Sequence, residues 1–452
     1  MPAHLDKIDF ARYIKAVDQC VTMKPEGRIS QVVGLIAQGD SVGLGIGGLC
    51  SIINGQGKKI LSEVVGFKKE QALFMPYGDI RGVSLGSRII PVASSQKVGV
   101  SDHLLGRIID GMGNPIDGKG DIEITHEYDL FGQPIGPMDR EQIKQPLDVG
   151  VAAINSMITL GKGQRMAIMA GSGVGKSVLM GMMTKHTAAD VVVIGLIGER
   201  GREVKDFVTE TLGEEGLKRA VVIAATSDSP PLVRMRGAYL ATTVAEYFRD
   251  QGKDVLLMVD SITRFAMSSR DVGLAAGEPP TSRGYTPSFF VKIPILLERA
   301  GNIENGGSIT GIYTVLVEGD DLNDPVGDTV RSIVDGHIVL SRDLANRGHY
   351  PAIDVLASVS RVMRDVSEKE HVAVRDKAVS VMAAYRNAED MITIGAYIDG
   401  SDPGVDEAKR LMPGLVQFLR QGMNRKSDMK ASVDGLKKAL GINDAPKGKG
   451  KA

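Results

Sequence analysis

The distribution of apolar residues predicts two different structures in the first hundred residues of the chain. Residues 1–25 carry apolar side chains at helical spacing and are expected to form a short helical lead-in. Between residues 26 and 95, short β-branched runs alternate with glycine-rich breaks. Frequent short strands with glycine turns are typical of a small closed β-barrel. Its predicted strands are Ser30–Ile36, Cys50–Ile53, Ile60–Val65 and Ala72–Met75.

Residues 96–350 show a different pattern, in which continuous apolar runs alternate with amphipathic stretches. A turn-rich segment, Gly106–Gly120, is expected to connect the barrel to this region. Runs that are apolar along their whole length predict strands buried on both faces of a mainly parallel sheet. The clearest of them are Arg165–Met169, Val191–Ile197, Ala220–Ala225, Val255–Val259, Ile309–Val317 and Gly336–Leu340.

Beyond about Pro351 the strand signals fade and helical patterns take over. Helices are expected within Lys377–Ala388, Val405–Gln421 and Ser427–Ala439, which together predict a C-terminal helical domain over residues 351–440. The Gly/Lys-rich tail, residues 441–452, is expected to be disordered.

Composition narrows the class of protein. A chain of 452 residues is too long for one hydrophobic core, and its net charge of −1 argues against a general electrostatic nucleic-acid binder. Cys20 and Cys50 form neither a disulfide framework nor a metal-ligand spacing, which favours a reducing compartment. No apolar run reaches the ~20 residues that cross a bilayer. The protein is therefore expected in the cytoplasm, with any membrane association peripheral.

The clearest chemical signal is the sequence AGSGVGKS at Ala170–Ser177, between a predicted strand and a predicted helix. Glycines let backbone N–H groups turn towards phosphate oxygens, and the helix N-terminus adds its dipole. Lys176 is expected to reach the β- and γ-phosphates of ATP, and the Ser177 hydroxyl to bind Mg²⁺. This P-loop predicts an α/β, RecA-like core. The phosphate-binding residues are Gly171, Ser172, Gly173, Val174, Gly175, Lys176, Ser177 and Val178.

Two acidic residues are candidates for the chemistry beside this loop. Asp260 ends the apolar run Val255–Val259, where a carboxylate can support the Mg²⁺ shell. Glu199 follows Val191–Ile197 in the sequence GERGRE and can polarise the attacking water, although a solvated charged turn explains that sequence equally well. Arg361, in SVSRVM, is a candidate for a transition-state arginine, but its spacing does not distinguish it among the 54 Lys and Arg residues of the chain.

Several segments together resemble a known family. LGRIIDGMGNPIDGKG at residues 105–120, the P-loop, GERGRE at 198–203 and GHYPAIDVLASVSR at 348–361 are similar to the rotary ATP synthase catalytic-subunit superfamily, in order along nearly the whole chain. ATSDSPPLVR at 225–234, EYFRDQGKD at 246–254, GEPPTSRGYTPS at 277–288 and IGAYIDGSDP at 394–403 resemble the type III protein-export ATPases, most of all the flagellar ones. The injectisome ATPases are near relatives.

The resemblance implies a homohexameric ring with catalytic sites between subunits. It assigns Glu199, Lys176 and Arg361 to catalysis, with Arg361 reaching into the neighbour's site. Glu203 would join Ser177 and Asp260 around Mg²⁺, and Tyr350 would stack on the adenine, which offers a flat apolar face. It also implies a coiled-coil stalk protein in the pore beside Glu278–Tyr285, a peripheral regulator or stator protein, export substrates with their chaperones, and a membrane export gate at the inner membrane.

Two positions depart from the family pattern. Relatives usually carry Arg where this chain has Ala152, so a contact made there is lost or replaced. The synthase subunits carry a second aromatic near the position of Met423, and methionine beside the adenine is expected to loosen base selectivity.

The sequence thus predicts a Mg-ATP hydrolase that energises type III protein export, by releasing or unfolding substrate–chaperone complexes. An injectisome ATPase, a synthase subunit, a hexameric RNA translocase and a non-hydrolysing ring subunit are the alternatives. The export-type loop argues against a synthase subunit. The barrel region has few aromatic and basic residues for single-stranded RNA, so no nucleic-acid partner is expected. Lys176 and Glu199 are both present, which argues against a ring subunit without activity.

Overall fold

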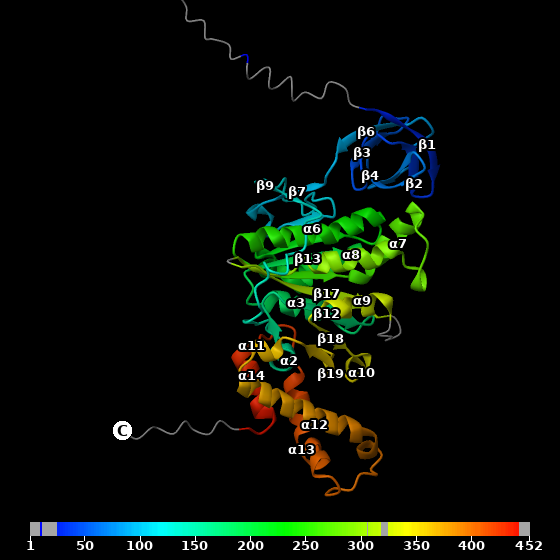
Figure 1. Cartoon of the computed structure of the whole chain (residues 1–452). Helices are drawn as coiled ribbons and strands as arrows, with labels where there is room; N and C mark the ends of the chain where they lie inside the picture. The colour runs from blue at the N-terminus through cyan, green and yellow to red at the C-terminus, as the bar shows by residue number, and fades with distance from the viewer. Residues whose placement is uncertain (1–9, 11–24, 305, 318–323, 443–452) are drawn as a thin grey trace, which may run out of the picture. The chain divides into compact units, whose positions relative to one another are not determined.

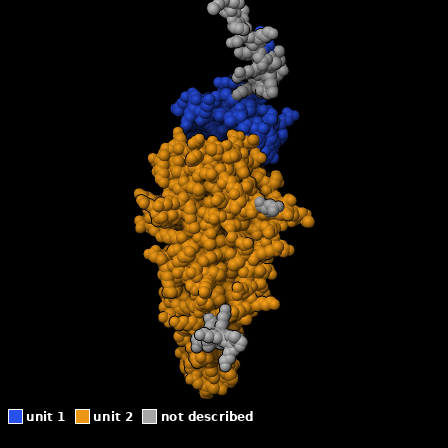
Figure 2. Space-filling view, turned by 90° about the vertical axis from the view of Figure 1, so that its left-hand side faces the viewer, with its two compact units in different colours: residues 1–96 blue, residues 97–452 orange. Residues whose placement is uncertain are grey.

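The computed structural model describes residue 10 and residues 25–304, 306–317 and 324–442. The predicted lead-in helix therefore lies outside the described residues except for Phe10, as does the predicted disordered tail from residue 443. The chain divides into two compact units, Met1–Gln96 and Lys97–Ala452 (Figure 2). The boundaries predicted within the second unit stay predictions.

The first unit contains a closed barrel of six antiparallel strands in the order β1-β2-β5-β4-β3-β6, which confirms the predicted barrel. The single strand expected at Ser30–Ile36 is wrong, because a turn at Gly34, with φ of 57°, separates two strands there. Inside the barrel, burial raises the pKa of the Cys50 thiol to about 12, which disfavours the nucleophilic thiolate form. The strands are β1 Gly27–Val33, β2 Ile36–Asp40, β3 Leu49–Ile53, β4 Lys59–Lys68, β5 Gln71–Pro76 and β6 Arg88–Ala93.

The second unit is built on a sheet whose main path runs β19-β18-β12-β17-β15-β13-β14-β8, with β16 paired to β17 at the side. The six strands predicted for this region are all present, and neighbours among them are parallel. All seven residues of β13 are buried, as expected for a strand covered on both faces. The six are β12 Arg165–Ala170, β13 Val191–Ile197, β14 Ala220–Ala225, β15 Asp254–Asp260, β17 Ser308–Leu316 and β18 Gly336–Leu340.

Two strands on the main path of this sheet lie where the sequence predicted none. The segment expected to be only a turn-rich connector contains β8 (Ile108–Asp110), which pairs in parallel with β14. The strand signals do not end at Pro351, because β19 (Ile353–Ser360) pairs antiparallel with β18. The other short strands are β7 Lys97–Val100, β9 His126–Asp129, β10 Pro146–Leu147, β11 Leu160–Gly161 and β16 Gly301–Asn302.

Helices cover both faces of the sheet. In Figure 1, α6 (Pro231–Asp250) and α7 (Ile262–Ala276) lie on one side of the strands and α3 (Lys176–His186) on the other. The Ser261 hydroxyl caps α7 by accepting a hydrogen bond from the Arg264 N–H, and Gly277 ends that helix with φ of 95°. The remaining elements are η1 Asp102–Leu104, α2 Ala152–Met157, α4 Gly201–Asp206, η2 Phe207–Leu212, α5 Gly213–Lys218, η3 Ser282–Gly284, α8 Pro287–Leu297, α9 Pro325–Ile333, α10 Arg342–Asn346 and α11 Met363–Val366.

The three predicted C-terminal helices are confirmed as α12 (Lys369–Thr393), α13 (Pro403–Leu419) and α14 (Met429–Ala439). The side chain of Asp402 caps α13, because it accepts hydrogen bonds from two backbone N–H groups of the first turn. Buried leucines on α13 and α14 join the same hydrophobic core as the α3 face of the sheet. No helix in the described ranges combines the length and the apolar character needed to cross a membrane.

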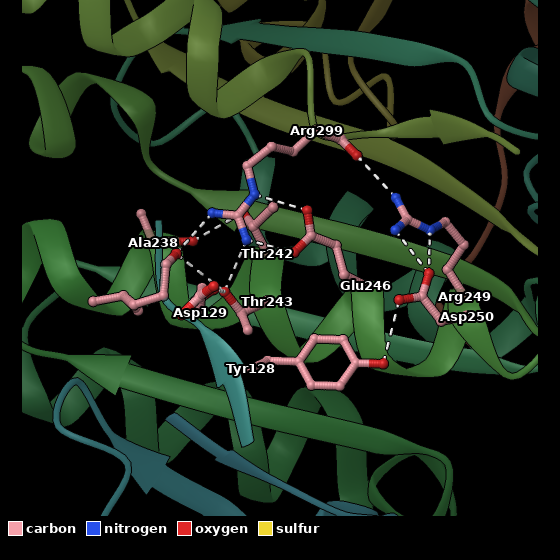
Figure 3. A network of polar contacts seen from close by, with 10 residues as sticks. Tyr128, Asp129, Ala238, Thr242, Thr243, Glu246, Arg249, Asp250 and Arg299 are labelled. Atoms are coloured by element: carbon pink, nitrogen blue, oxygen red, sulfur yellow. Dashed lines mark hydrogen bonds and ion pairs between the residues drawn. The ribbon is translucent and has the colours of Figure 1, made fainter. Parts of the chain in front are cut away.

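A buried polar network holds the end of α8 against α6 (Figure 3). The guanidinium of Arg299, which is 0% exposed, forms an ion pair with Glu246 and donates to the Thr243 hydroxyl at 2.8 Å. It also donates to the carbonyl of Leu130 at 2.9 Å, in the loop after β9. Each of these donors has a partner, so burial of this charge does not leave it uncompensated.

Candidate nucleotide site

The predicted P-loop occupies the turn between β12 and α3. β12 ends at Ala170 and α3 begins at Lys176. Gly173 and Gly175 have φ of 78° and 94°, a conformation that residues with a side chain rarely adopt. Val174 between them is buried and anchors the turn in the core. The loop therefore has the strand–turn–helix geometry that directs backbone N–H groups and a helix N-terminus at an anion.

Lys176 lies between the two predicted carboxylates. Its Nζ is 2.5 Å from Asp260 Oδ1 and 3.4 Å from Glu199 Oε1. Asp260 is the last residue of β15 and Glu199 follows β13, and because these strands are parallel neighbours both residues lie at the carboxyl edge of the sheet. The three side chains are 12%, 4% and 16% exposed for Lys176, Asp260 and Glu199.

The surroundings shift the pKa of all three groups. Burial raises the pKa of the Glu199 carboxyl, Lys176 opposes this rise and the neighbouring Glu203 adds to it. Burial likewise raises the pKa of Asp260, which accepts a hydrogen bond from Thr314 at 2.6 Å. Burial alone would lower the pKa of the Lys176 ammonium, but the charges of Asp260 and Glu199 raise it above its ordinary value. Asp260 and Glu199 share the single cation of Lys176. The excess negative charge of the two carboxylates can therefore bind a second cationic group or a hydrogen-bond donor.

Lys176 and Glu199 line a cleft of about 790 Å³. Ser177 and Val178, at the start of α3, are exposed and line it as well. Glu203, on the first turn of α4, lines the same cleft with a side chain that is 51% exposed. The predicted loop residues Gly171, Ser172, Gly173 and Gly175 complete that wall. The structure thus brings these predicted residues together, and their roles stay predictions.

Tyr350 lies at the same edge of the sheet. Its ring carbons are 3.6 Å from the position that a Cβ of Gly175 would take, and 47% of the residue is exposed. The Tyr350 carbonyl accepts a hydrogen bond from the Gln421 N–H at 3.0 Å, which ties the Tyr350 backbone to the segment that carries the exposed Met423. Gln421 also accepts from the Ala152 N–H at 2.7 Å. Gln421 thus joins the backbone at Ala152 to the backbone at Tyr350.

Arg361 is absent from this cleft. It follows β19, and because β19 runs antiparallel to β18, Arg361 lies beside Gly336 at the amino edge of the sheet, opposite the P-loop. The residue is exposed, and no carboxylate pairs with its guanidinium in the part of the chain that the structure describes. Within a single chain, Arg361 therefore does not join Lys176 and Glu199.

Three arginines line the cleft without having been predicted there: Arg200, inside the GERGRE segment, Arg264 and Arg342. Arg264, on α7, lies against Gly198, where a Cβ would approach the Arg264 side chain to 2.8 Å. Arg342 begins α10, directly after the carboxyl end of β18. A position just after a parallel strand was a signal that could have identified Arg342. Arg264 sits within the first turn of a helix, and only the fold shows that this turn faces the P-loop.

The segment Glu278–Tyr285, which the resemblance places at a ring pore, follows α7. Its residues 279–283 are all exposed. The Thr281 hydroxyl donates to the Tyr285 carbonyl at 2.7 Å and Glu278 accepts from the Ser288 N–H at 3.1 Å, so the loop is closed on itself at both ends.

Comparison with known proteins agrees with this geometry. Residues 150–360 match the ATP synthase alpha/beta family, nucleotide-binding domain, and residues 367–438 match the T3SS EscN ATPase C-terminal domain. The flagellum-specific ATP synthase of Pseudomonas aeruginosa is 46% identical over 436 residues, which cover 95% of this chain and 97% of that protein. The type 3 secretion system ATPase of Xanthomonas euvesicatoria is 46% identical over 396 residues, or 87% of this chain and 89% of that protein.

A solved structure is similar over most of the chain. The assembled ATPase EscN from the enteropathogenic E. coli type III secretion system superposes with a TM-score of 0.86 at 43% identity, covering 92% of this chain and 100% of that one. EscN in complex with its central stalk EscO gives a TM-score of 0.84 at 42% identity, covering 92% and 100%. With its P-loop, its paired acids and these relatives, the chain belongs to the ATP synthase alpha/beta family, in the branch of flagellum-specific ATP synthases and type III secretion ATPases.

Proposed function

We propose that this chain is a ring ATPase that hydrolyses Mg-ATP at its P-loop cleft to energise type III protein export, and the motif resemblance favours flagellar export. The observation that carries the proposal is the contact of the P-loop lysine with two carboxylates at one end of a cleft of about 790 Å³. In this mechanism Lys176 leaves its carboxylate partners for the phosphates of the nucleotide. Glu199, released from Lys176, orients and polarises the attacking water.

The residues around the cleft fit a bound Mg²⁺ ion. The Ser177 hydroxyl and the Glu203 carboxylate line the cleft, and the Asp260 carboxylate lies behind Lys176, so the candidates are all oxygen donors. Mg²⁺ prefers one or two such groups together with phosphate oxygens and water. The ion, when bound, would neutralise part of the phosphate charge. Tyr350 is proposed to stack on the adenine, with Met423 beside it.

We propose that the working unit is a homohexamer in which Arg361 completes the site of the neighbouring subunit. Its exposure and its distance from its own P-loop support a role across a subunit boundary. The exposed loop at 279–283 is proposed to face a coiled-coil stalk protein, and the solved complex of EscN with its central stalk supports such a partner. A peripheral regulator, export substrates with chaperones and a membrane export gate are the further proposed partners, with the ring bound peripherally to the inner membrane.

The test of the catalytic assignment is Glu199→Gln in the purified ring. We expect Mg-ATP binding to remain and hydrolysis to fall ~100-fold or more, since water is no longer polarised. Glu215→Gln is the matched control, because Glu215 is an exposed glutamate paired with Lys218 outside the cleft. Normal hydrolysis by the Glu199→Gln protein would remove Glu199 from the mechanism.

A second experiment identifies the export apparatus. The ring is cross-linked in cells and purified, and its partners are identified by mass spectrometry. Flagellar export components among the partners would support the flagellar role, and injectisome components would replace it by the virulence role. Stimulation of hydrolysis by RNA would contradict both, because no nucleic-acid partner is proposed.

A further inference from the structure

We infer that Asp335, Gln164 and Ser360 are positioning residues that hold the backbone of Arg361 for its action on the neighbouring subunit. This inference rests on the proposed function, in which Arg361 acts across a subunit boundary. It assigns a role to a group of polar side chains at the amino edge of the sheet, far from the cleft that contains the P-loop.

The backbone of Arg361 is held by residues from three separate segments. The Arg361 N–H donates to the Asp335 carbonyl at 2.9 Å, and the preceding Ser360 pairs with Gly336 across β18 and β19. The amide of Gln164, which is 0% exposed, donates both to that Asp335 carbonyl at 3.2 Å and to the Ser360 hydroxyl at 3.1 Å. The Ser360 hydroxyl in turn donates to the Thr159 carbonyl at 2.8 Å.

The Asp335 carboxylate fixes this carbonyl to the first residue of β12. Its Oδ2 accepts from the Arg165 backbone N–H at 3.0 Å and from the Arg165 Nε at 3.2 Å, and its Oδ1 accepts from Nη2 at 3.1 Å. The Arg165 guanidinium also forms an ion pair with Glu298, next to the end of α8. Charge-assisted bonds in a partly buried site are strong and directional, so the Asp335 carbonyl has a defined position.

These contacts fix the backbone of Arg361 while its side chain extends from an exposed position. The guanidinium of Arg361 is exposed and no carboxylate holds it in the described ranges, while its N–H is fixed to β12 through Asp335. β12 therefore carries the chain's own P-loop at its carboxyl end and the anchor of Arg361 at its amino end. A transition-state arginine depends on placement, since a misplacement of ~1 Å can cost ~100-fold in rate.

The test uses rings assembled from two kinds of subunit. Arg361→Ala subunits keep an intact P-loop but lack the arginine. Lys176→Ala subunits cannot turn over nucleotide but donate an intact Arg361. Mixed rings should regain ATP hydrolysis that neither variant shows alone. An active site forms wherever the Arg361 of a Lys176→Ala subunit reaches the intact P-loop of an Arg361→Ala neighbour. This first result tests the proposed function alone.

The positioning residues are then changed only in the donor subunit, whose own site is already inactive. We expect donors that also carry Asp335→Asn to restore hydrolysis ~10-fold less well, with the KM for ATP unchanged. Asp254→Asn is the matched control, since Asp254 pairs with Lys162 at the same edge of the sheet and is 29% exposed, against 24% for Asp335. This control donor should restore hydrolysis fully.

The outcomes separate the two ideas. Failure of the unmodified donor to restore hydrolysis would overturn the role of Arg361 in the neighbour's site. Full restoration by the Asp335→Asn donor would leave that role intact and overturn the positioning inference. Native mass spectrometry shows whether each donor enters the rings. If the Asp335→Asn donor does not enter the rings, the donor with the smaller change Ser360→Ala takes its place. We expect this donor to restore less hydrolysis than the unmodified donor, and full restoration would contradict the inference.

Discussion

Two buried charge clusters in the second unit show opposite ways of keeping charge inside a protein. Around Arg299, one cation is matched by one carboxylate, a hydroxyl and a carbonyl, and the guanidinium is 0% exposed. Around Lys176, one cation faces two carboxylates whose pKa values are raised, and the group opens onto a cleft. In the Arg299 cluster every charge is paired, so the cluster holds the surrounding chain segments in one conformation. In the Lys176 cluster the negative charge is in excess, which is typical of a site that binds a ligand.

The largest expected effect comes from Lys176→Ala, which removes the cation of the open cluster. We expect ATP hydrolysis to fall ~1000-fold, because phosphate charge loses its stabilising partner. Steady-state hydrolysis assays measure this. Lys185→Ala is a control on the same helix, near its C-terminus. If Lys176→Ala hydrolysed ATP normally, the open cluster would be structural and the comparison would fail.

Arg299→Met, which breaks the closed cluster, is expected to act on stability instead. Glu246 would be left buried without its cation, at a cost of ~3–5 kcal/mol in the free energy of unfolding. Chemical denaturation measures that cost. The double variant Glu246→Leu/Arg299→Met should recover most of the loss, because it removes both charges. A loss of turnover in stably folded Arg299→Met protein would instead give this cluster a functional role.

Tyr350→Ala tests the proposed adenine contact beside Gly175 and should have a smaller effect. Loss of stacking on the base is expected to raise the KM for ATP about ten-fold, with kcat nearly unchanged. Tyr350→Phe keeps the ring and should behave like the unmodified protein. Comparing ATP with GTP in both variants shows whether Tyr350 selects the base. An unchanged KM in Tyr350→Ala would place the adenine elsewhere.

The smallest expected effect is the pH dependence of stability that Glu199 contributes. Its folded pKa is raised above the unfolded value, so ionising it disfavours the folded state as the pH rises through that window. Glu199→Gln should therefore be slightly more stable than the unmodified protein at neutral pH, and this gain should disappear below the unfolded pKa. Denaturation at several pH values measures the difference. Hydrolysis by the unmodified protein should fall on acidification at a higher pH than for an ordinary glutamate.

A gain in stability that was independent of pH would show that Glu199 has the same pKa in the folded and unfolded states. That result would remove the raised pKa on which the comparison between the two clusters depends.

The sequence alone was sufficient for the main architecture. Apolar runs such as Val191–Ile197 predicted the parallel strands, because a strand buried on both faces must be apolar along its whole length. AGSGVGKS predicted the phosphate loop, because its glycines permit a backbone that other residues resist. Glu199 and Asp260 were each expected beside the P-loop, since parallel strands end at one edge. That β13 and β15 are neighbours, which brings both acids to Lys176, was decided by the fold.

Other features depended on contacts between distant segments. β8 has only three residues and becomes a strand because β14 offers it an edge, and β19 alternates too weakly to be recognised without β18 beside it. Tyr350 and Arg361 flank the two ends of β19. Antiparallel pairing with β18, which no local pattern encodes, decides that Tyr350 lies at the P-loop edge and Arg361 at the other. Asp335, Gln164 and Arg264 carry no motif. Their positions are decided by which strand ends and helix turns the folded sheet brings together, because hydrogen bonds and ion pairs act only over a few ångströms.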